Sequence, residues 1–286
     1  MRIALLGARG QLGSALTRHL VGQVVPLTSQ SLDVADAAQV AAALERVGAD
    51  LVINAAAYNL VDQAEGEPQR AYAVNALGPR HVSQWCAQRD VPLVHISTDY
   101  VFGLDFVRKA PYLESDLTGP LGAYGISKLA GELYVRALAP RHFVVRTCGL
   151  FGNSQSSGKG NFVKTMLRLG RERGAVSVVD DQWCTPTSAD DLAQAIVRLI
   201  ETGQYGLYHA TSRGATTWCR LAQEVFHLAR MPTTVTPIPS ADYPTPARRP
   251  AYSVLECSKL GGLGITLPPW QEGLARYVEE LEGRDG

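Results

Sequence analysis

The sequence predicts an α/β fold with a doubly wound parallel sheet and a smaller, mostly C-terminal lobe. Short apolar runs alternate with helix-like stretches through the first half of the chain, which is the pattern of βαβ units. The apolar runs are continuous rather than alternating, as expected for parallel strands buried on both faces. With 286 residues, the chain is long enough for a main domain and a smaller attached lobe.

Five short apolar runs are predicted to be strands of the sheet. They span residues 3–6, 24–27, 51–54, 93–97 and 143–147. The stretches between them place apolar residues at helical spacing and are predicted to be helices. These stretches span residues 11–20, 36–47, 68–89 and 124–138.

The second half of the chain is less regular and is predicted to hold most of the smaller lobe. Residues 161–173 and 188–202 have helical spacing, residues 176–179 resemble a strand that returns to the main sheet, and the proline-rich residues 232–250 resemble irregular chain. The two lobes are therefore expected to interleave. We assign residues 1–150 and about 176–210 to the sheet domain, and about 151–175 and 211–286 to the smaller lobe.

The composition argues against several classes of partner. Twenty-seven basic residues balance 27 acidic ones, so no net field attracts nucleic acid or an anionic membrane, and no apolar run is long enough to span a bilayer. The five cysteines are widely separated and never form a C-x-x-C pair, so neither a disulfide framework nor a metal site is predicted. The chain opens with a strand-like run without room for a signal peptide, and we expect an unprocessed cytoplasmic protein.

A glycine motif follows the first predicted strand and opens the first predicted helix. It reads Gly7-x-x-Gly10-x-x-Gly13, and this setting favours a Rossmann-type dinucleotide site in which the helix N-terminus receives a pyrophosphate, although such glycines can also mark a simple turn. No carboxylate follows the second strand at residues 28–30, and Arg9 offers positive charge. NADPH is therefore favoured, and NADH remains possible.

Further along the chain, two segments are placed to border a nucleotide. Asp33 and Val34 follow the second strand and are positioned to contact adenine, or alternatively to precede a helix cap. Ala55, Ala56 and Ala57 follow the third strand, where small side chains let a nucleotide lie close to the backbone or simply serve helix–sheet packing.

Tyr124 and Lys128 are the candidate catalytic pair. Four residues apart on a predicted helix, they lie on one face as neighbours. A nearby ammonium is expected to lower the pKa of the phenol and to let it donate a proton to a carbonyl oxygen, although such a pair can also be a surface pair. Thr98 ends the fourth strand, at the sheet edge where ligands bind, so it is placed to hydrogen-bond the reacting oxygen or to cap a turn.

With these residues assembled, nearly the whole chain resembles the extended short-chain dehydrogenase/reductase family. The stretches that carry the resemblance are GARGQLG at 7–13, NAAAYNLVDQAE at 54–65, STDYVF at 97–102, YGISKLAGE at 124–132, GNFVKTMLRL at 160–169, DQWCTPT at 181–187 and YPTPARRPAYSVL at 243–255. Within the family, the chain is similar to reductases of dTDP-4-keto sugars. That similarity implies hydride transfer to the C4 carbonyl of dTDP-4-dehydro-6-deoxy-L-mannose, giving dTDP-L-rhamnose.

The resemblance also implies roles for individual residues. Thr98, Tyr124 and Lys128 would form the catalytic triad, with Tyr124 the proton donor and Lys128 also holding the nicotinamide ribose. The cofactor site would include Gly7, Gly10, Gln11, Leu12, Asp33, Val34, Ala55, Ala56 and Tyr58, besides Tyr124 and Lys128. The dTDP-sugar would contact Thr98, Tyr100, Tyr124, Asn161, Lys164 and Arg248, and Arg249 offers a second fork for a pyrophosphate.

Departures from the family pattern leave the sugar and the assembly open. Residues 146–151 read RTCGLF where many relatives read RTSWVY, so an aromatic wall near the sugar is missing, and Cys184 replaces a glycine. Some relatives pair through magnesium held by glutamates, one in the first helix, but residues 14–16 supply no carboxylate. We predict neither that metal nor that dimer, and expect a monomer or a homodimer.

Three other functions share parts of this sequence pattern. A dehydratase would resemble Thr-Asp-Glu where this chain has Tyr100 in the third position, so dehydration is disfavoured. A sugar-nucleotide epimerase remains an alternative, because it uses the same Tyr and Lys. A non-catalytic NADP-binding regulatory subunit is the other alternative, although the intact Thr98, Tyr124 and Lys128 argue against it.

Overall fold

The computed structural model describes residues 1–155 and 160–283, and its centre is a six-stranded parallel sheet. In spatial order the strands are β2 (Gln23–Leu27), β1 (Arg2–Leu6), β3 (Leu51–Asn54), β4 (Leu93–Thr98), β5 (His142–Thr147) and β10 (Gly206–His209). The five predicted strands are confirmed to within one residue at each end. β10 was not predicted, because its sequence GLYH is too short and too polar to form an apolar run.

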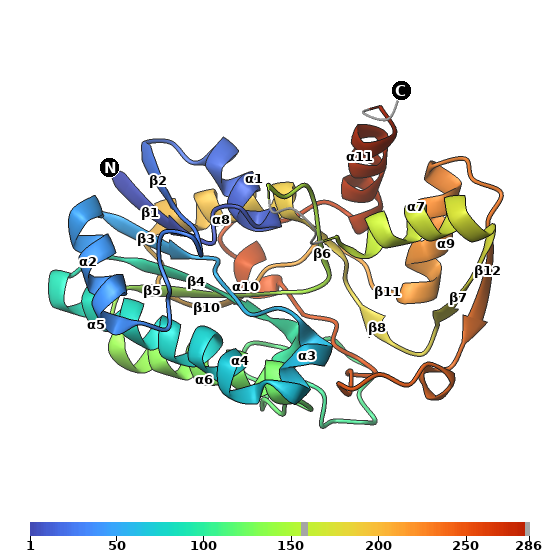
Figure 1. Ribbon diagram of the computed structural model, residues 1–286, viewed down its shortest axis with the longest axis horizontal. Coiled ribbons are helices and arrows are strands. Elements are labelled where there is room, and N and C mark those ends of the chain that lie inside the picture. Colours follow the sequence, from blue (N-terminus) through green and yellow to red (C-terminus); the bar gives the residue numbers. More distant parts are fainter. Residues whose placement is uncertain (156–159, 284–286) are drawn as a thin grey trace.

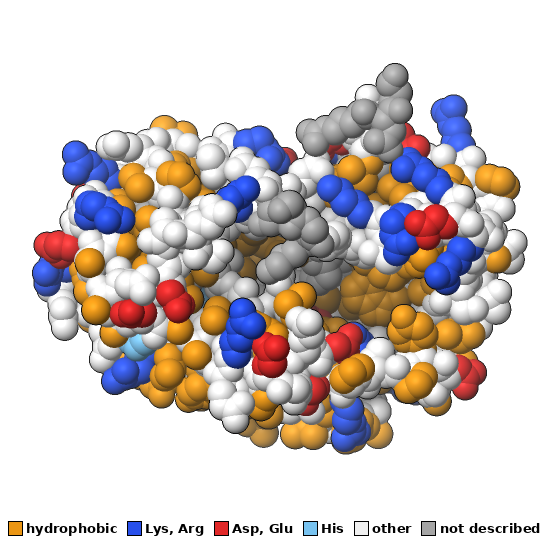
Figure 2. All heavy atoms as spheres, viewed as in Figure 1, with side chains coloured by type: hydrophobic (Ala, Val, Ile, Leu, Met, Phe, Trp, Pro, Cys, Tyr) orange, Lys and Arg blue, Asp and Glu red, His pale blue; other side chains and the backbone are white. Residues whose placement is uncertain are grey.

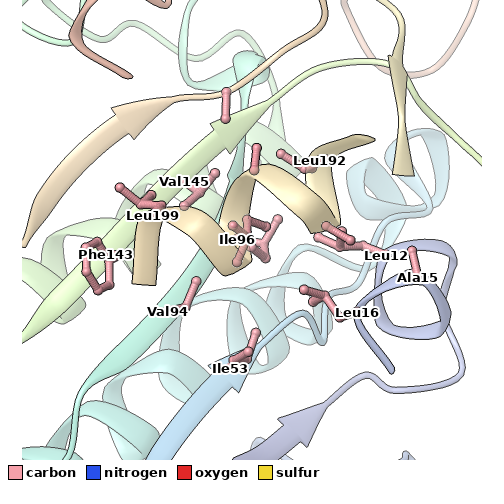
Figure 3. Packing of buried hydrophobic residues seen from close by; sticks show 14 of the residues in the cluster. Leu12, Ala15, Leu16, Ile53, Val94, Ile96, Phe143, Val145, Leu192 and Leu199 are labelled. Atoms are coloured by element: carbon pink, nitrogen blue, oxygen red, sulfur yellow. The ribbon is translucent and has the colours of Figure 1, made fainter. Parts of the chain in front are cut away.

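Helices cover both faces of the sheet, as the doubly wound prediction requires (Figure 1). One face carries α1 (Gln11–His19) and α8 (Ala189–Thr202), and the other carries α2 (Ala37–Val47), α5 (Gly78–Arg89) and α6 (Ala123–Leu138). Figure 3 shows the first of these interfaces, where Leu16 of α1 and Leu199 of α8 face Ile53, Val94 and Phe143 of the strands. The chain crosses from one face to the other between β1 and β3, which opens a crevice at the carboxyl ends of these strands.

The predicted helix over residues 68–89 is helical throughout but is not uniform. It consists of α4 (Pro68–Tyr72), the π-helical turn η1 (Ala73–Leu77) and α5, and α3 (Val61–Gly66) precedes it. Asn75, inside the π turn, accepts from Tyr58 N at 2.8 Å and donates to Ser127 Oγ at 3.0 Å. Single π turns of this kind are common near functional sites. This one fastens the segment after β3 to α6.

The second lobe is built on its own hydrophobic cluster. Its main elements are α7 (Phe162–Arg173), α9 (Trp218–Leu228), α11 (Trp270–Glu282) and the parallel pair β7 (Ala175–Val179) and β12 (Thr234–Ile238). Smaller elements are the pair β8 (Trp183–Cys184) and β11 (Thr216–Thr217), the pair β6 (Leu150–Phe151) and β9 (Thr187–Ser188), and the 3-10 turn η3 (Ser240–Asp242). Two further short elements belong to the sheet domain: the 3-10 turn η2 (Asp99–Val101) follows β4, and α10 (Ser258–Gly261) packs on the sheet through Leu260.

Two expectations for this half of the chain were wrong. The strand expected to return to the main sheet pairs instead with β12, and β12 lies within the segment expected to be irregular. β7 buries only Val178 and Val179, so it lacks the two buried faces of an inner strand of a doubly wound sheet. The place beyond β5 is taken by β10.

Within the described ranges, no helix is both long and apolar enough to cross a membrane.

Candidate active site

The glycine loop after β1 packs directly against the end of β3. Gly7 has φ +77°, and a Cβ built on it would lie 2.6 Å from the backbone carbon of Ala55. A Cβ on Gly13 would lie 2.3 Å from the oxygen of Gly7. Both positions therefore require glycine, one for its conformation and both for close approach. At the start of α1, Gly10 contributes no capping side chain, so the first amides of the helix are offered to a ligand.

A cavity of about 820 Å³ lies beside this loop and fits the adenosine half of a dinucleotide. Of the predicted cofactor residues, it is lined by Gly7, Arg9, Gly10, Asp33, Val34, Ala55, Ala56 and Ala57. Thr28, Ser29 and Gln30, at the end of β2, also line it. The glycine cradle, the uncapped helix N-terminus and this space together fit a bound NADP or NAD.

The end of β2 carries no carboxylate that could repel a 2′-phosphate. Arg9 Nη1 donates to Gln30 Oε1 at 3.1 Å, so its guanidinium lies at the cavity wall beside this strand end. The nearest acid along the chain, Asp33, turns its Oδ1 to the amide of Ala35 at 2.9 Å. The cap of α2 is Asp36, which accepts from Ala38 N and Gln39 N.

Tyr58 is the predicted cofactor residue that the structure does not bring to the cavity wall. Its ring packs among Ala64 and Ala71, and its hydroxyl donates to Glu67 Oε2 at 3.1 Å. The residue pattern after β3 gave no information on which side chains turn inward. Asn59, next along the chain, lines the cavity instead.

A second cavity, of about 470 Å³, continues from the glycine loop toward the second lobe. The predicted residues that line it are Gly10, Gln11, Leu12, Ala55, Ala57, Thr98, Tyr124, Lys128 and Asn161. Thr98 and Tyr124 also line a smaller cavity of about 160 Å³. Figure 2 shows the surface hollowed between the two lobes, with hydrophobic side chains in the hollow. The structure thus gathers the three predicted catalytic side chains in one cleft.

Tyr124 and Lys128 lie on α6, close to the ends of β4 and β5. Lys128 Nζ donates to the Ile96 carbonyl at 2.6 Å. α6 approaches η2 closely at Gly125, where a Cβ would lie 2.3 Å from the Tyr100 carbonyl oxygen. The first amide of the helix, Ala123 N, donates to Glu65 Oε1 at 2.8 Å. These contacts fix the start of the helix against the strand that carries Thr98.

The electrostatics of the pair differ from the sequence expectation. Burial raises the pKa of Tyr124 to about 12, and the nearby Thr98 hydroxyl opposes this only in part. Burial also lowers the pKa of Lys128 to about 8, against the opposing charge of Glu132. The expected lowering of the phenol pKa is therefore wrong. The Lys128 ammonium donates to the Ile96 carbonyl. Burial is the largest influence on the pKa of the Tyr124 phenol.

A buried hydrogen-bond network lies behind Thr98. Thr98 Oγ1 donates to Asp99 Oδ1 at 3.1 Å and accepts from Tyr100 N at 3.2 Å. Asp99 Oδ2 accepts from Ser253 Oγ at 2.6 Å and from Cys148 Sγ at 3.0 Å. Burial raises the pKa of the Asp99 carboxyl, and these three donors oppose that change. Asp99 and Ser253 were not predicted as site residues from the sequence.

Aromatic side chains form part of the wall of the smaller cavity. Trp183, Trp218 and Tyr100 line it, and the Tyr100 ring meets that of Tyr124 edge-on, with centroids 5.8 Å apart. The aromatic wall that the segment after β5 lacks is thus supplied by η2, β8 and α9. The tryptophans were missed because their placement depends on how the second lobe folds over the sheet.

The predicted substrate residues of the second lobe lie at different places. Asn161 lines the 470 Å³ cavity, caps α7 through Lys164 N, and donates from Nδ2 to Gln11 Oε1 at 2.7 Å. Lys164 is not among the residues lining the cavities described above.

The two adjacent arginines also separate. Arg248 lines a separate small cavity together with Tyr100 and Tyr124, and its guanidinium lies over the Phe106 ring. Arg249 Nη2 pairs with Asp62 Oδ2 at 2.8 Å. The Arg249 guanidinium is therefore already engaged by an acid of α3.

Among the described residues, no group of three or more His, Cys, Asp or Glu side chains is arranged to hold a metal ion.

Residues 1–282 match the family model described as RmlD substrate binding domain. A dTDP-4-dehydrorhamnose reductase from Sinorhizobium fredii (strain NBRC 101917 / NGR234) is 38% identical over 301 aligned residues, which cover 100% of both chains. A protein of the same name from Mycobacterium tuberculosis (strain H37Rv, ATCC 25618) is 42% identical over 284 residues, covering 96% of this chain and 91% of its own.

The crystal structure of a dTDP-4-dehydrorhamnose reductase from Bacillus anthracis, in complex with NADP, is similar to this one. Its TM-score is 0.93 at 39% identity, and the match covers 98% of this chain and 99% of the other.

Proposed function

This chain belongs to the RmlD substrate binding domain family, and we propose that it uses NADPH to reduce the C4 ketone of dTDP-4-dehydrorhamnose, giving dTDP-L-rhamnose. The observation that carries the proposal is the placement of Thr98, Tyr124 and Lys128 in one cleft that continues from the glycine-loop cavity. A sugar ketone held in that cleft would lie between a proton donor and the expected position of the nicotinamide.

The chain's own residues would bind the cofactor in an extended arrangement. When bound, NADPH supplies the hydride that adds to the carbonyl carbon. The uncapped start of α1 receives the pyrophosphate, and the small side chains of Ala55 and Ala56 leave room for the adenosine half. Arg9 is placed to bind the 2′-phosphate, which supports NADPH over NADH. Lys128 would hold the nicotinamide ribose.

Tyr124 is the proposed proton donor. Its raised pKa keeps the phenol protonated over the physiological range, so the proton is available at Oη when the carbonyl oxygen becomes basic. Lys128, as an ammonium, would stabilise the phenolate that remains. The hydroxyl of Thr98 lies on the same cavity wall and would orient the reacting oxygen.

The sugar nucleotide is proposed to extend across the cleft into the second lobe. Tyr100 is a candidate contact because it lines the smaller cavity with Tyr124, and Arg248 is one because it shares a neighbouring small cavity with both tyrosines. Asn161 and Lys164 are candidate contacts at the start of α7, where Asn161 lines the larger cavity. The aromatic rings of the smaller cavity would exclude water from the reacting sugar.

We propose that residues 1–150 and a returning segment up to about residue 210 form the cofactor-binding domain. The chain was expected to return to this domain near residue 176. We place the return at the start of α8 instead, because β7 pairs with β12 whereas α8 packs on the sheet. The remaining residues would form the substrate-binding lobe. We also propose that the protein is cytoplasmic and that it is a monomer or a homodimer.

An assay with the proposed substrate tests the function directly. Purified protein is mixed with NADPH and enzymatically made dTDP-4-dehydrorhamnose, and nicotinamide absorbance and sugar products are followed. We expect NADPH loss in equal amount to the dTDP-L-rhamnose formed. An altered sugar without NADPH loss would identify an epimerase instead, and NADPH binding without any change of sugar would identify a regulatory subunit.

A further inference from the structure

The catalytic helix is fastened to the sheet by a buried ion pair that the mechanism above does not use. Glu132 of α6 and Arg146 of β5 have side chains that are 0% and 2% exposed. Arg146 Nη2 donates to Glu132 Oε2 at 2.7 Å, and Arg146 Nε donates to Glu132 Oε1 at 2.9 Å. The pair is bidentate and excluded from water, and such a pair is costly to leave half-formed.

The same carboxylate also binds the strand that carries Thr98. Ser97 Oγ donates to Glu132 Oε1 at 2.5 Å. Both Ser97 and Thr98 line the 470 Å³ cavity, but their hydroxyls have different partners: Ser97 Oγ donates to Glu132, and Thr98 Oγ1 donates to Asp99. Glu132 also follows Lys128 by four residues on α6, which makes the two side chains neighbours on one helix face.

We propose that Glu132 is a positioning residue that joins the strand of Thr98 to the helix of Tyr124 and Lys128 and keeps the Lys128 side chain an ammonium. This proposal rests on the catalytic role proposed for Lys128. The Glu132 carboxylate would then have two effects. Its hydrogen bond from Ser97 fixes the position of the end of β4, and its negative charge offsets the unfavourable burial of the Lys128 ammonium.

Among the charged and titratable groups around Lys128, Glu132 is the one that favours the ammonium. Burial lowers the pKa of Lys128, and the charge of Glu132 raises it. On β4, His95 is fully buried and its pKa is held well below the usual value by burial and by Lys128, so it is neutral. On β5, Arg146 faces Glu132 directly. Asp99 of η2 is engaged by Thr98, Ser253 and Cys148.

The charge effect can be measured without any turnover. The chain contains five lysines, at positions 109, 128, 159, 164 and 259, so ¹³Cε-lysine NMR of the free protein gives a spectrum simple enough to titrate. The signal missing from Lys128→Met identifies Lys128. We expect Glu132→Gln, which keeps the size and removes the charge, to lower the pKa of Lys128. We expect Glu132→Asp, which keeps the charge, to restore it toward the wild-type value.

Unchanged titration of Lys128 in Glu132→Gln would overturn the charge part of the proposal. If Glu132→Gln does not fold, the double variant Glu132→Gln/Arg146→Met replaces it, because it leaves no buried charge unpaired. A lowering of the Lys128 pKa in the same direction but smaller is expected there, because the positive charge of Arg146 is removed together with the negative charge of Glu132.

The positional effect is tested with Ser97→Ala, which removes one hydrogen bond and leaves the ion pair intact. We expect kcat to fall several-fold, with unchanged NADPH affinity and unchanged titration of Lys128. Wild-type kcat would overturn the positional part. Failure of the proposed function is distinguishable, because a fully active Lys128→Met would refute the role of Lys128 without altering the titration results.

Discussion

Ser253 and Asp99, 154 residues apart in sequence, are joined by a hydrogen bond of 2.6 Å from the hydroxyl to Oδ2 of the carboxylate. The other carboxylate oxygen accepts from Thr98 at 3.1 Å. Thr98 and Ser253 are therefore hydrogen-bonded to the same buried carboxylate. A residue of the C-terminal segment therefore helps to set the orientation of a proposed catalytic hydroxyl.

Replacing Ser253 by alanine tests this link. The buried carboxylate loses its shortest hydrogen bond, so we expect the free energy of unfolding to fall by about 1–3 kcal/mol and kcat to fall with little change in NADPH affinity. Urea unfolding and steady-state kinetics measure both quantities. Ser258→Ala, at an exposed serine five positions on, is the control. Wild-type stability and kcat in Ser253→Ala would show that the hydrogen bond has no such role.

The phenol oxygen of Tyr124 is the second target. Tyr124→Phe keeps the ring and removes the proposed proton donor, so kcat should fall by roughly 10²–10⁴-fold, the usual worth of general-acid catalysis. NADPH affinity, measured by fluorescence titration, should stay near the wild-type value. Tyr134→Phe is a matched control, since Tyr134 lies on the same helix and contacts Arg80 rather than the cleft. Full activity of Tyr124→Phe would place the proton donor elsewhere.

The strands that could be predicted are those in which a run of mostly apolar residues indicates burial. β3 and β4 are buried along their whole length and are mostly apolar, apart from Asn54, His95 and the Ser97–Thr98 end, so their positions were evident. β10 is short and is buried only at its end, at Tyr208 and His209, and its place beside β5 depends on the chain returning from the second lobe. β7 has strand-like residues, but its partner β12 lies about 60 residues later in the chain. β12 was not predicted because the prolines in and around it favour irregular chain.

In the site, too, the residues that belong to a local sequence motif could be predicted, and those brought in from distant parts of the chain could not. Gly7 and the pair Tyr124 and Lys128 could be found because their spacing fits a turn and a helix, and the structure brings them to one cleft. Ser253 and Trp218 follow no motif that indicates a site. They reach the cavity only because the second lobe folds back over the carboxyl ends of the strands.

Gly7→Ala tests the fit of the dinucleotide loop. An alanine would have to adopt φ +77° and place its Cβ 2.6 Å from backbone atoms of Ala55. Left-handed conformation alone costs about 1–2 kcal/mol, and displacement of the loop should weaken NADPH binding by at least roughly tenfold. Isothermal titration calorimetry measures the affinity. Gly66→Ala is the control, because no atom lies within 4 Å of its built Cβ. Equal NADPH affinity of Gly7→Ala and wild type would argue against a cofactor at this loop.

The last prediction concerns pH and a buried histidine. His209 is 0% exposed. Arg146 Nη1 lies 3.3 Å from its Nε2, and the Tyr112 carbonyl lies 3.0 Å from its Nδ1. Because Arg146 can only donate, Nε2 must accept and Nδ1 must carry the single proton, which fixes the neutral ring. Burial, and then the charge of Arg146, lower the pKa of His209 to about 3.

In the unfolded chain this imidazole has its ordinary pKa of about 6.5, so below that pH the unfolded state binds a proton that the native state does not. The stabilisation is complete above about pH 6.5 and is lost progressively as the pH falls toward the native value, at about 1.4 kcal/mol per pH unit. His209→Gln cannot titrate, and its amide can still accept from Arg146. The free energy of unfolding in urea should therefore depend less steeply on pH between about pH 6 and pH 4. His227→Gln, at an exposed histidine of α9, is the control. A slope for His209→Gln as steep as that of wild type would show that the native protein protonates this ring without cost.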